Sequence, residues 1–526
     1  MAAFVAGALA FVALWTWPAA AGVWVSSAER LSVAIPAVLA AAVAAGLGRR
    51  LGLAALGAVV LPTLALEAVP WLPTDGKLRV HVDAVALGAL GVALVVSAVA
   101  LRARGGRVVA AVLVVVTGVL AGARRLDDVR GGAVDAPPIV LLTLDTLRAD
   151  HLAGFGGDVD VAHTPHLDAF FRTARVFRAA YAPLALTGPS HTSMLSGRGV
   201  EAHQVTVNGQ TLPDALPWVP EELRAAGWRT RAAVSAAVLD ASLGFGRGFD
   251  HFDSAFEDRP RRAFAFLNLR GYRPRAGSTE NRPGRDTLAR VDGFAPGTFT
   301  WVHLYDAHWP YTPTLEAGRR VGLSSVEPAR GAGVGRQIDP SERAWPADEV
   351  ARTKLLYRAE IEDLDRLVGE ALARVPADAT VILAGDHGES LDEHGYYFSH
   401  GRLPFAPDVH TLLAVRSPGL APEWVDTPVS LARIADTVRA AAGLGEARGL
   451  LGPIDGTPVL SLAYTSNFLG PRVPDHPLGP LAGVALREPG RSTVWTRWHE
   501  AAAYAPADPR ELSPLPIESA EHAALR

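Results

Sequence analysis

The sequence predicts two regions: a transmembrane region of about five helices, followed by an α/β domain whose mixed, mainly parallel sheet lies between helices. Residues 1–134 carry only 6 Asp/Glu and 11 Lys/Arg, and their long uncharged runs are typical of bilayer-spanning helices. From about Ala136, short apolar runs alternate with amphipathic stretches, which is the pattern of a layered α/β domain. The 526 residues include no cysteine, which excludes disulfides, thiolate metal sites and cysteine nucleophiles.

Five uncharged runs support the transmembrane prediction. They cover residues 1–27, 31–48, 51–66, 84–101 and 108–123. A helix needs about 17 to 25 residues to cross a bilayer, and five such runs in series are hard to reconcile with buried helices of a soluble protein. A cleaved signal peptide is the competing interpretation of the first run. No basic segment precedes that run and further apolar runs follow it, so we expect a multi-pass protein of the cell membrane.

The basic residues between these runs predict the orientation. With the N-terminus inside, the arginines that face the cytoplasm are Arg49, Arg50, Arg102, Arg104 and Arg107. Five spans then place the following domain on the extracytoplasmic side. Arg124 and Arg125 follow the last run and favour the opposite orientation.

The remainder of the chain is acidic, with 48 Asp/Glu against 39 Lys/Arg after residue 134. Nucleic-acid binding requires clustered Lys/Arg that neutralise phosphates, and no basic stripe of this kind occurs. We therefore expect no nucleic-acid partner.

Polar side chains follow three predicted strands at the points where those strands end. Ile139–Leu144 runs into Asp145, and Thr298–Leu304 runs into Asp306 and His308. The strand at 380–384 is followed by Asp386, His387, His394 and His400. The ends of parallel strands meet at one sheet edge, so we expect a cluster of carboxylate and imidazole groups there. Taken singly, Asp145 is equally explained as a helix cap or turn residue. For His308 and His400, the less favoured alternative is that they are solvated loop histidines.

A second feature is TGPSHTSMLSGR, from Thr187 to Arg198. A Thr, a Gly-Pro turn and a short helix of small residues place the Thr187 hydroxyl at a helix N-terminus, where anions are favoured. An ordinary N-cap is the alternative explanation.

For four further segments the sequence predicts secondary structure but no functional role. Thr164 and Pro165 begin a predicted helix whose core residues are Leu167, Phe170, Phe171, Ala174 and Phe177. Residues 254–296 and 315–346 are predicted to be irregular loops, and residues 492–498 a strand.

Together these motifs resemble the sulfatase and alkaline phosphatase superfamily. The resemblance runs from about residue 136 to 460, through LDTLRADHLAGFG, PLALTGPSHTSMLSGR, HWPY, YRAEIEDLDRLVGE and GDHGESLDEHG. It implies an alkaline-phosphatase-like fold and a division into a transmembrane region (1–134), a catalytic domain (135–461) and a C-terminal extension of that domain (462–526).

The resemblance also implies the site residues. Asp145, Thr187, Asp386 and His387 would bind one divalent metal ion (Zn, Mn, Mg or Ca), with a second ion left open. Thr187 would be the nucleophile, since a metal lowers the pKa of a bound hydroxyl. His308 and His400 would bind the transferred group or assist the leaving group.

Four features depart from true sulfatases. Those enzymes oxidise the first residue of CxPSR or SxPSR to formylglycine, whereas this chain has TGPSH, and threonine cannot form that aldehyde. His191 replaces the family's Arg, Thr146 replaces the second Asp of the paired ligands, and neither lysine lies near a motif. A direct Thr nucleophile and five preceding spans instead resemble phosphoethanolamine transferases and lipoteichoic acid synthases, although the paired cysteines common in the former are missing.

These observations predict a membrane-anchored hydrolase or transferase that acts on phosphate esters. Its partners would be the lipid bilayer and a phosphate- or sulfate-ester substrate. A lipid-linked donor or acceptor is the natural hypothesis. The transferred head group would then be phosphoethanolamine or phosphoglycerol. One alternative is a sulfatase that works without formylglycine. The other is a non-catalytic membrane sensor or scaffold that retains the fold.

Overall fold

The computed structural model describes residues 134–156, 161–256, 281–327, 345–445, 448–465, 481–499, 501–505, 508 and 510–515. The five predicted spans lie within residues 1–133, outside the described residues. In the parts of the chain that are described, no helix has both the length and the apolar character needed to cross a bilayer. The limits of the three predicted domains stay predictions.

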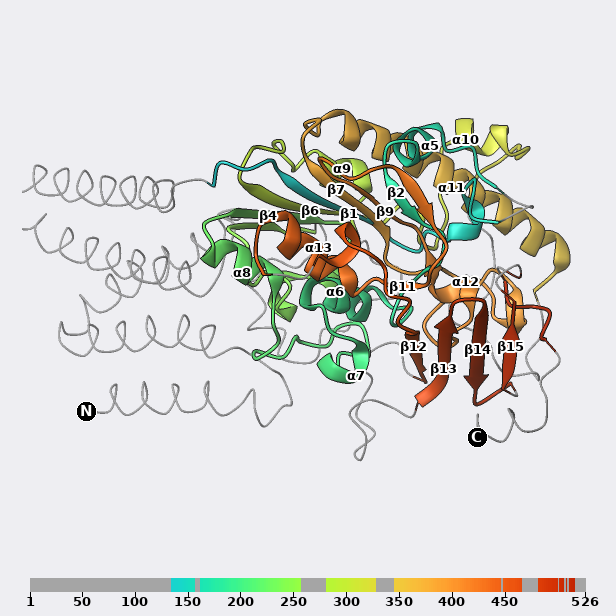
Figure 1. The fold of residues 1–526 in the computed structure, drawn as a ribbon. Coiled ribbons are helices and arrows are strands. Elements are labelled where there is room, and N and C mark those ends of the chain that lie inside the picture. The colour runs from blue at the N-terminus through green and yellow to red at the C-terminus, as the bar shows by residue number, and fades with distance from the viewer. Residues whose placement is uncertain are drawn as a thin grey trace, which may run out of the picture. The chain divides into compact units, whose positions relative to one another are not determined.

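The centre of the domain is an eight-stranded sheet with the strand order β10-β2-β9-β7-β1-β6-β4-β5 (Figure 1). Its strands are β1 (Ile139–Leu144), β2 (Arg175–Phe177), β4 (Arg229–Val234), β5 (His251–Asp253), β6 (Thr298–Leu304), β7 (Thr380–Gly385), β9 (Leu413–Arg416) and β10 (Glu423–Val425). Strand β9 pairs antiparallel with β2 and β7, and the remaining pairs are parallel. The predicted fold class, an alkaline-phosphatase-like α/β domain with a mixed, mainly parallel sheet, is confirmed for this part of the chain.

Helices cover both faces of this sheet, with α5, α9 and α11 on one face and α6, α8 and α13 on the other (Figure 1). The helices are α5 (Pro165–Phe171), α6 (Thr187–Ser196), α7 (Val200–His203), α8 (Val219–Ala225), α9 (Gly284–Leu288), α10 (Leu315–Arg320), α11 (Ala347–Ala373), α12 (Ala406–Val409) and α13 (Arg433–Ala441). Every residue of β1, β6 and β7 is buried, because helices shield both faces of the central strands. The apolar runs of these strands therefore form the core.

Two smaller sheets complete the described part. A three-stranded sheet contains β3 (Ala180–Tyr181), β8 (His410–Thr411) and β11 (Val429–Ser430). An antiparallel sheet contains β12 (Val459–Tyr464), β13 (Leu481–Glu488), β14 (Arg491–Thr496) and β15 (Ala502–Tyr504). Ala485 and Val494 of the second sheet pack against Phe405, so this sheet is part of the same compact unit as the strands of the large sheet.

Several local predictions need correction. The predicted helix begins at Pro165 as expected, but it ends at Phe171, so Ala174 and Phe177 are buried from a loop and from β2 instead. The segments predicted as irregular contain α9 and α10, which were missed because both helices are short. The strand predicted at 492–498 occurs as β14, shifted by one to two residues.

A buried ion-pair network holds the loop that follows β1. The Arg148 side chain is fully buried and donates two hydrogen bonds to Asp150, at 2.9 and 2.7 Å. Its Nη2 also lies 2.9 Å from Glu393 Oε1. This arginine lowers the pKa of Glu393 to about 2 and that of Asp150 further. The network links the loop after β1 to the segment after β7, which contains the predicted site residues Asp386, His387 and His400.

We expect Arg148→Met to lower the free energy of unfolding at pH 7 by about 3 kcal/mol, because it removes the fully buried cation from two buried carboxylates. Arg510 stays beside them, with its Nε 3.2 Å from Asp150 Oδ2 and 4.0 Å from Glu393 Oε1. Both carboxyl pKa values are depressed in the folded protein, so the wild-type network contributes stability above pH 4 and loses it as the pH falls. The difference between variant and wild type should therefore persist from pH 7 to about pH 5 and shrink between pH 4 and pH 2, as measured by urea unfolding. The control is Arg285→Met, an exposed arginine 3.9 Å from Asp286, which should change stability by less than about 1 kcal/mol. Equal effects of the two substitutions would contradict this prediction.

Candidate functional site

Three neighbouring segments bring the predicted site residues together. Strands β7, β1 and β6 are adjacent and parallel, so Asp145 and Asp386 leave the sheet at the same edge. Asp386 follows β7 directly, and its backbone N–H donates to the carbonyl of Leu144 at 3.1 Å. Helix α6 begins at Thr187, and Ser190 Oγ donates to the Asp386 carbonyl at 2.7 Å. The sheet edge and the first turn of α6 are thereby held against each other.

Thr187 lies at the N-terminus of α6 and is almost fully buried. Its Oγ1 lies 3.4 Å from Asp145 Oδ2 and 3.3 Å from His387 Nε2. The next residue, Gly188, donates its N–H to Asn208 Oδ1 at 2.8 Å. The Thr187 hydroxyl is therefore held between a carboxylate and an imidazole.

The Asp386 carboxylate is oriented by backbone groups. Oδ1 accepts hydrogen bonds from the N–H of Thr146 at 3.1 Å and of His387 at 2.8 Å. Thr146 has a φ of 52°, a left-handed conformation that costs a β-branched residue on the order of 1 kcal/mol. That strained turn directs the Thr146 N–H onto Asp386. Oδ2 has no hydrogen-bond partner in the described part of the chain.

The tautomer of His387 follows from its contacts. Nδ1 lies 2.8 Å from the carbonyl oxygen of Gly388, which only accepts, so Nδ1 carries the proton. Nε2 is left with its lone pair facing the site. It lies 3.6 Å from Asp386 Oδ2 and 3.9 Å from Asp145 Oδ1.

Asp145, Asp386 and His387 fit a divalent metal ion. They form a buried group whose ligand atoms lie within 4.8 Å of one another. Asp145 Oδ1 and Asp386 Oδ2 are buried and unpartnered among the described residues, and burial raises the pKa of both carboxyls. Ligands of a tetrahedral ion at 2.0–2.1 Å lie about 3.3 Å apart, close to the separations observed here, with the Thr187 hydroxyl as a fourth donor. Two carboxylates with one imidazole suit Zn²⁺ or Mn²⁺ better than Ca²⁺.

His308 and His400 lie beside this group. The His400 ring centroid is 4.4 Å from that of His387, and the Nε2 atoms of His400 and His308 are 3.2 Å apart. The Nδ1 atoms point at carbonyl oxygens, that of His400 at Ala185 (2.9 Å) and that of His308 at Trp309 (2.5 Å). Burial lowers the pKa of each imidazole to about 3. The structure thus brings together all six predicted site residues, while their roles stay predictions.

Two strand-exit residues lie elsewhere. Asp306 accepts a hydrogen bond from the N–H of Gly284 at 3.1 Å, and burial raises its pKa to about 6. His394 stacks on Phe405 with ring centroids 3.6 Å apart and contacts the carbonyl of Arg510. Neither belongs to a metal-ligating group in the described residues.

Residues that sequence reasoning missed at the site include His303 and Asn208. His303 Nε2 lies 3.3 Å from Asp145 Oδ2, although His303 sits inside the apolar run TFTWVHL. A polar residue near the end of a buried central strand is the signal that could have found it. Asn208 had no such signal, because it lies in a loop, and the hydrogen bond that joins it to the site in the described part of the chain comes from Gly188.

Comparison with known proteins shows the family and the fold of the chain. The sulfatase family model matches residues 137–444, which is well over half of the chain. No curated protein sequence matches the chain.

Three solved structures illustrate the similarity of fold. The phosphonate monoester hydrolase of Agrobacterium radiobacter is 19% identical, with 74% of this chain and 93% of that chain covered and a TM-score of 0.51. The corresponding enzyme from Silicibacter pomeroyi is 20% identical, with coverage of 74% and 93% and a TM-score of 0.52. A glycosaminoglycan-metabolism protein of Bacteroides thetaiotaomicron is 15% identical, with coverage of 74% and 94% and a TM-score of 0.53. The family match and the shared fold lead to one conclusion: this chain belongs to the sulfatase family of hydrolytic enzymes.

Proposed function

We propose that this chain is a membrane-anchored, metal-dependent enzyme that cleaves phosphate esters through a covalent intermediate on Thr187. The position of the Thr187 hydroxyl carries the proposal: it lies 3.4 Å from Asp145 Oδ2 and 3.3 Å from His387 Nε2, beside two buried carboxylates. Threonine cannot become formylglycine, so the hydroxyl itself is the candidate nucleophile.

Each side chain has a separate role in this proposal. A divalent ion held by Asp145, Asp386, His387 and Thr187 would lower the pKa of the hydroxyl and stabilise charge on the transferred group. Asp145 Oδ2 accepts the hydrogen bond of the hydroxyl and so orients its lone pairs. The His400 ring lies 4.4 Å from the His387 ring, and the Nε2 atoms of His400 and His308 are 3.2 Å apart, so both imidazoles can contact the transferred group or the leaving group.

The charge of the site favours a phosphodiester. Burial lowers the pKa of His308 and His400 to about 3, so both are neutral at pH 7 in the metal-free, ligand-free protein. With neutral imidazoles at these positions, the bound metal would be the main positive charge facing a substrate. A buried site with so little positive charge accommodates a monoanionic diester better than a dianionic monoester. Sulfate esters are also monoanionic, and the Thr nucleophile is the feature that favours phosphate over them.

Membrane tethering would make a phospholipid head group the natural diester. The supporting observations are the five apolar runs in residues 1–134 and the resemblance to phosphoethanolamine transferases and lipoteichoic acid synthases. On this proposal the domain faces the extracytoplasmic side and transfers phosphoethanolamine or phosphoglycerol from a lipid to an acceptor there.

We expect the full-length protein, loaded with Zn²⁺ or Mn²⁺, to hydrolyse an aryl phosphodiester faster than an aryl phosphate monoester or an aryl sulfate. Thr187→Ala should lower kcat/KM by about 10³-fold or more, because it removes the nucleophile, whereas Thr187→Ser should retain partial activity. The measurement is release of the aryl alcohol, followed by absorbance.

Thr192→Val is the matched control on the same helix, since the Thr192 hydroxyl bonds only to the Gly188 carbonyl among the described contacts. Its kcat/KM should stay near the wild-type value. Activity that survives Thr187→Ala would contradict the covalent mechanism. A preference for the aryl sulfate would instead support the sulfatase alternative.

Metal should stabilise the protein more at pH 8 than at pH 6. Burial raises the pKa of Asp145 and Asp386, so in the metal-free fold these carboxyls contribute stability at low pH and lose it as the pH rises through their folded pKa values. A metal ion competes with those protons and binds more tightly as they leave. At 100 times the Kd, binding adds about 2.7 kcal/mol. Thermal unfolding with and without Zn²⁺ at both pH values measures this difference. A Zn²⁺-induced Tm shift at pH 6 that equals or exceeds the shift at pH 8 would contradict the prediction. So would a Zn²⁺-induced Tm shift in Asp386→Asn that is as large as in the wild type.

A further inference from the structure

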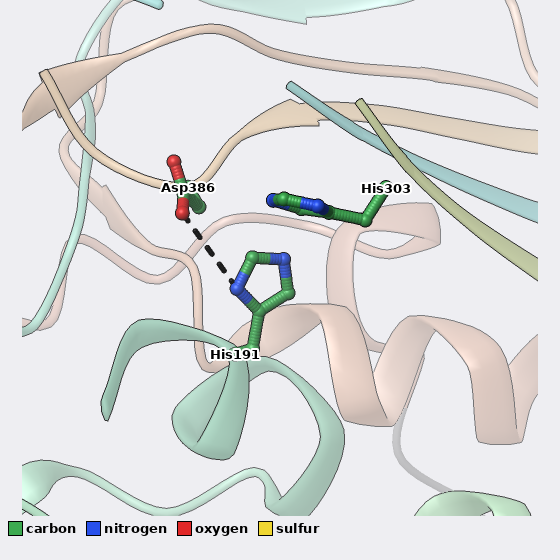
Figure 2. Close-up of side chains that lie close together, drawn as sticks. All are labelled: His191, His303 and Asp386. Atoms are coloured by element: carbon green, nitrogen blue, oxygen red, sulfur yellow. Dashed lines mark ion pairs between the residues drawn. The ribbon is translucent and has the colours of Figure 1, made fainter. Parts of the chain in front are cut away.

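A second buried group of possible metal ligands lies next to the first. It consists of His191 on α6, His303 on β6 and Asp386, with His191 Nδ1 3.7 Å from Asp386 Oδ2 (Figure 2). The contacts of His191 argue against a metal here. Its Nδ1 lies 2.8 Å from the carbonyl oxygen of Thr187, which only accepts, so this nitrogen carries a proton and has no free lone pair.

The other nitrogen of His191 is also used. Nε2 lies 3.0 Å from Thr143 Oγ1, and the same Oγ1 accepts the indole N–H of Trp301 at 3.0 Å. The hydroxyl proton of Thr143 is therefore free to be donated to His191 Nε2. Both nitrogens of His191 are satisfied by protein groups, so His191 is a structural residue of α6 and His303 needs a separate explanation.

His303 is buried without a good hydrogen bond. It is the second-last residue of β6, pairs in register with Thr143 of β1, and has no solvent exposure. Neither ring nitrogen makes a hydrogen bond of ordinary geometry to another described residue. Its Nε2 nevertheless lies 3.3 Å from Asp145 Oδ2, and a buried imidazole without partners is costly. The nearby carboxylate is the group that can offset this cost.

We propose that His303 is a positioning residue for Asp145, acting through Nε2, which lies 3.3 Å from Oδ2. The inference rests on the proposed function, since it concerns how Asp145 is presented to a metal. Oδ1 of Asp145 is unpartnered in the described structure and lies 3.9 Å from His387 Nε2. Holding Oδ2 from the β6 side turns Oδ1 toward His387 and Asp386. Hydrogen-bonded partners of this kind orient metal ligands and raise metal affinity.

His303 becomes more important after the first chemical step. Before it, Thr187 Oγ1 also donates to Asp145 Oδ2, at 3.4 Å. In that step a bond forms between Thr187 Oγ1 and phosphorus, and the bond from phosphorus to the leaving-group oxygen breaks. Thr187 loses its hydroxyl proton, and the leaving group takes up one proton. Esterified Thr187 has no proton to donate. His303 Nε2, 3.3 Å away, is then the remaining side-chain nitrogen beside Oδ2 among the described contacts. This lasts until attack by water or an acceptor hydroxyl on phosphorus restores the Thr187 hydroxyl.

The test compares His303→Leu with His303→Gln in the full-length protein. Zn²⁺ affinity is measured by competition with a chromophoric chelator, and Co²⁺-loaded protein is examined by visible absorption. We expect His303→Leu to weaken Zn²⁺ binding by about 10–100-fold at unchanged stoichiometry and to shift the Co²⁺ bands. His303→Gln, whose amide N–H can reach Oδ2, should recover most of the affinity.

The reaction with an aryl phosphodiester gives a second readout. His303→Leu should retain a burst of aryl alcohol while the steady-state rate falls by at least tenfold, because the step after esterification depends more on His303. His203→Leu is the control for general loss of stability. His203 is a buried histidine that contacts Ser193 Oγ (2.9 Å) and the N–H of Val205 (3.0 Å), and its loss should lower Tm without changing Zn²⁺ affinity.

Three outcomes would overturn the assignment. Wild-type Zn²⁺ affinity in His303→Leu would remove the positioning role. Loss of one bound ion per chain in both His303 variants would make His303 a metal ligand instead. If His303→Leu does not fold, a His303→Gln protein with no more affinity than Asp145→Asn would also reject the proposal. Failure of the proposed function looks different, because the wild type itself would then bind no metal and Thr187→Ala would remain active.

Discussion

The two buried carboxylates of Asp145 and Asp386 are the constraint on which the rest of the site depends. Each keeps one oxygen without a hydrogen-bond partner, and in the described residues only imidazoles lie within ion-pair distance of either. Burial raises the pKa of both, so the pair is unfavourable as two negative charges without a cation. A bound divalent metal would offset this cost, and it would explain why a threonine hydroxyl and the Nε2 of His387 lie close to both carboxylates.

The fold around the carboxylates serves to hold them in place. Adjacent parallel strands bring Asp145 and Asp386 to one sheet edge, and the strained turn at Thr146 directs a backbone N–H onto Asp386. Helix α6 is joined to the same edge through Ser190. Three imidazoles at the site, those of His387, His400 and His308, each have Nδ1 within hydrogen-bond distance of a backbone carbonyl. The Nδ1 of His308 also lies 2.6 Å from the Tyr305 hydroxyl. The orientation of the site therefore depends largely on backbone groups.

Much of this arrangement could be predicted from the sequence. The strands that precede Asp145 and Asp386 are mostly apolar runs followed directly by an aspartate, and their lengths were predicted to within one residue. The start of α6 at Thr187 was likewise predicted from its Gly-Pro turn. His303 was not, because its contact with Asp145 depends on the pairing of β6 beside β1, which one strand's sequence does not specify. The early end of α5 was also missed, since Ala174 and Phe177 are buried at helical spacing without lying on the helix.

The central claim is that Thr187 itself becomes esterified. The most direct measurement is peptide mass spectrometry of the full-length protein after incubation with Zn²⁺ or Mn²⁺ and phospholipid vesicles containing phosphatidylethanolamine and phosphatidylglycerol. The account predicts a mass increase of a phosphorylated head group on Thr187 in the peptide that contains Thr187–Arg198, absent when metal is chelated. Turnover of the lipid with an unmodified Thr187 at every time point, undiminished in Thr187→Ala, would contradict it.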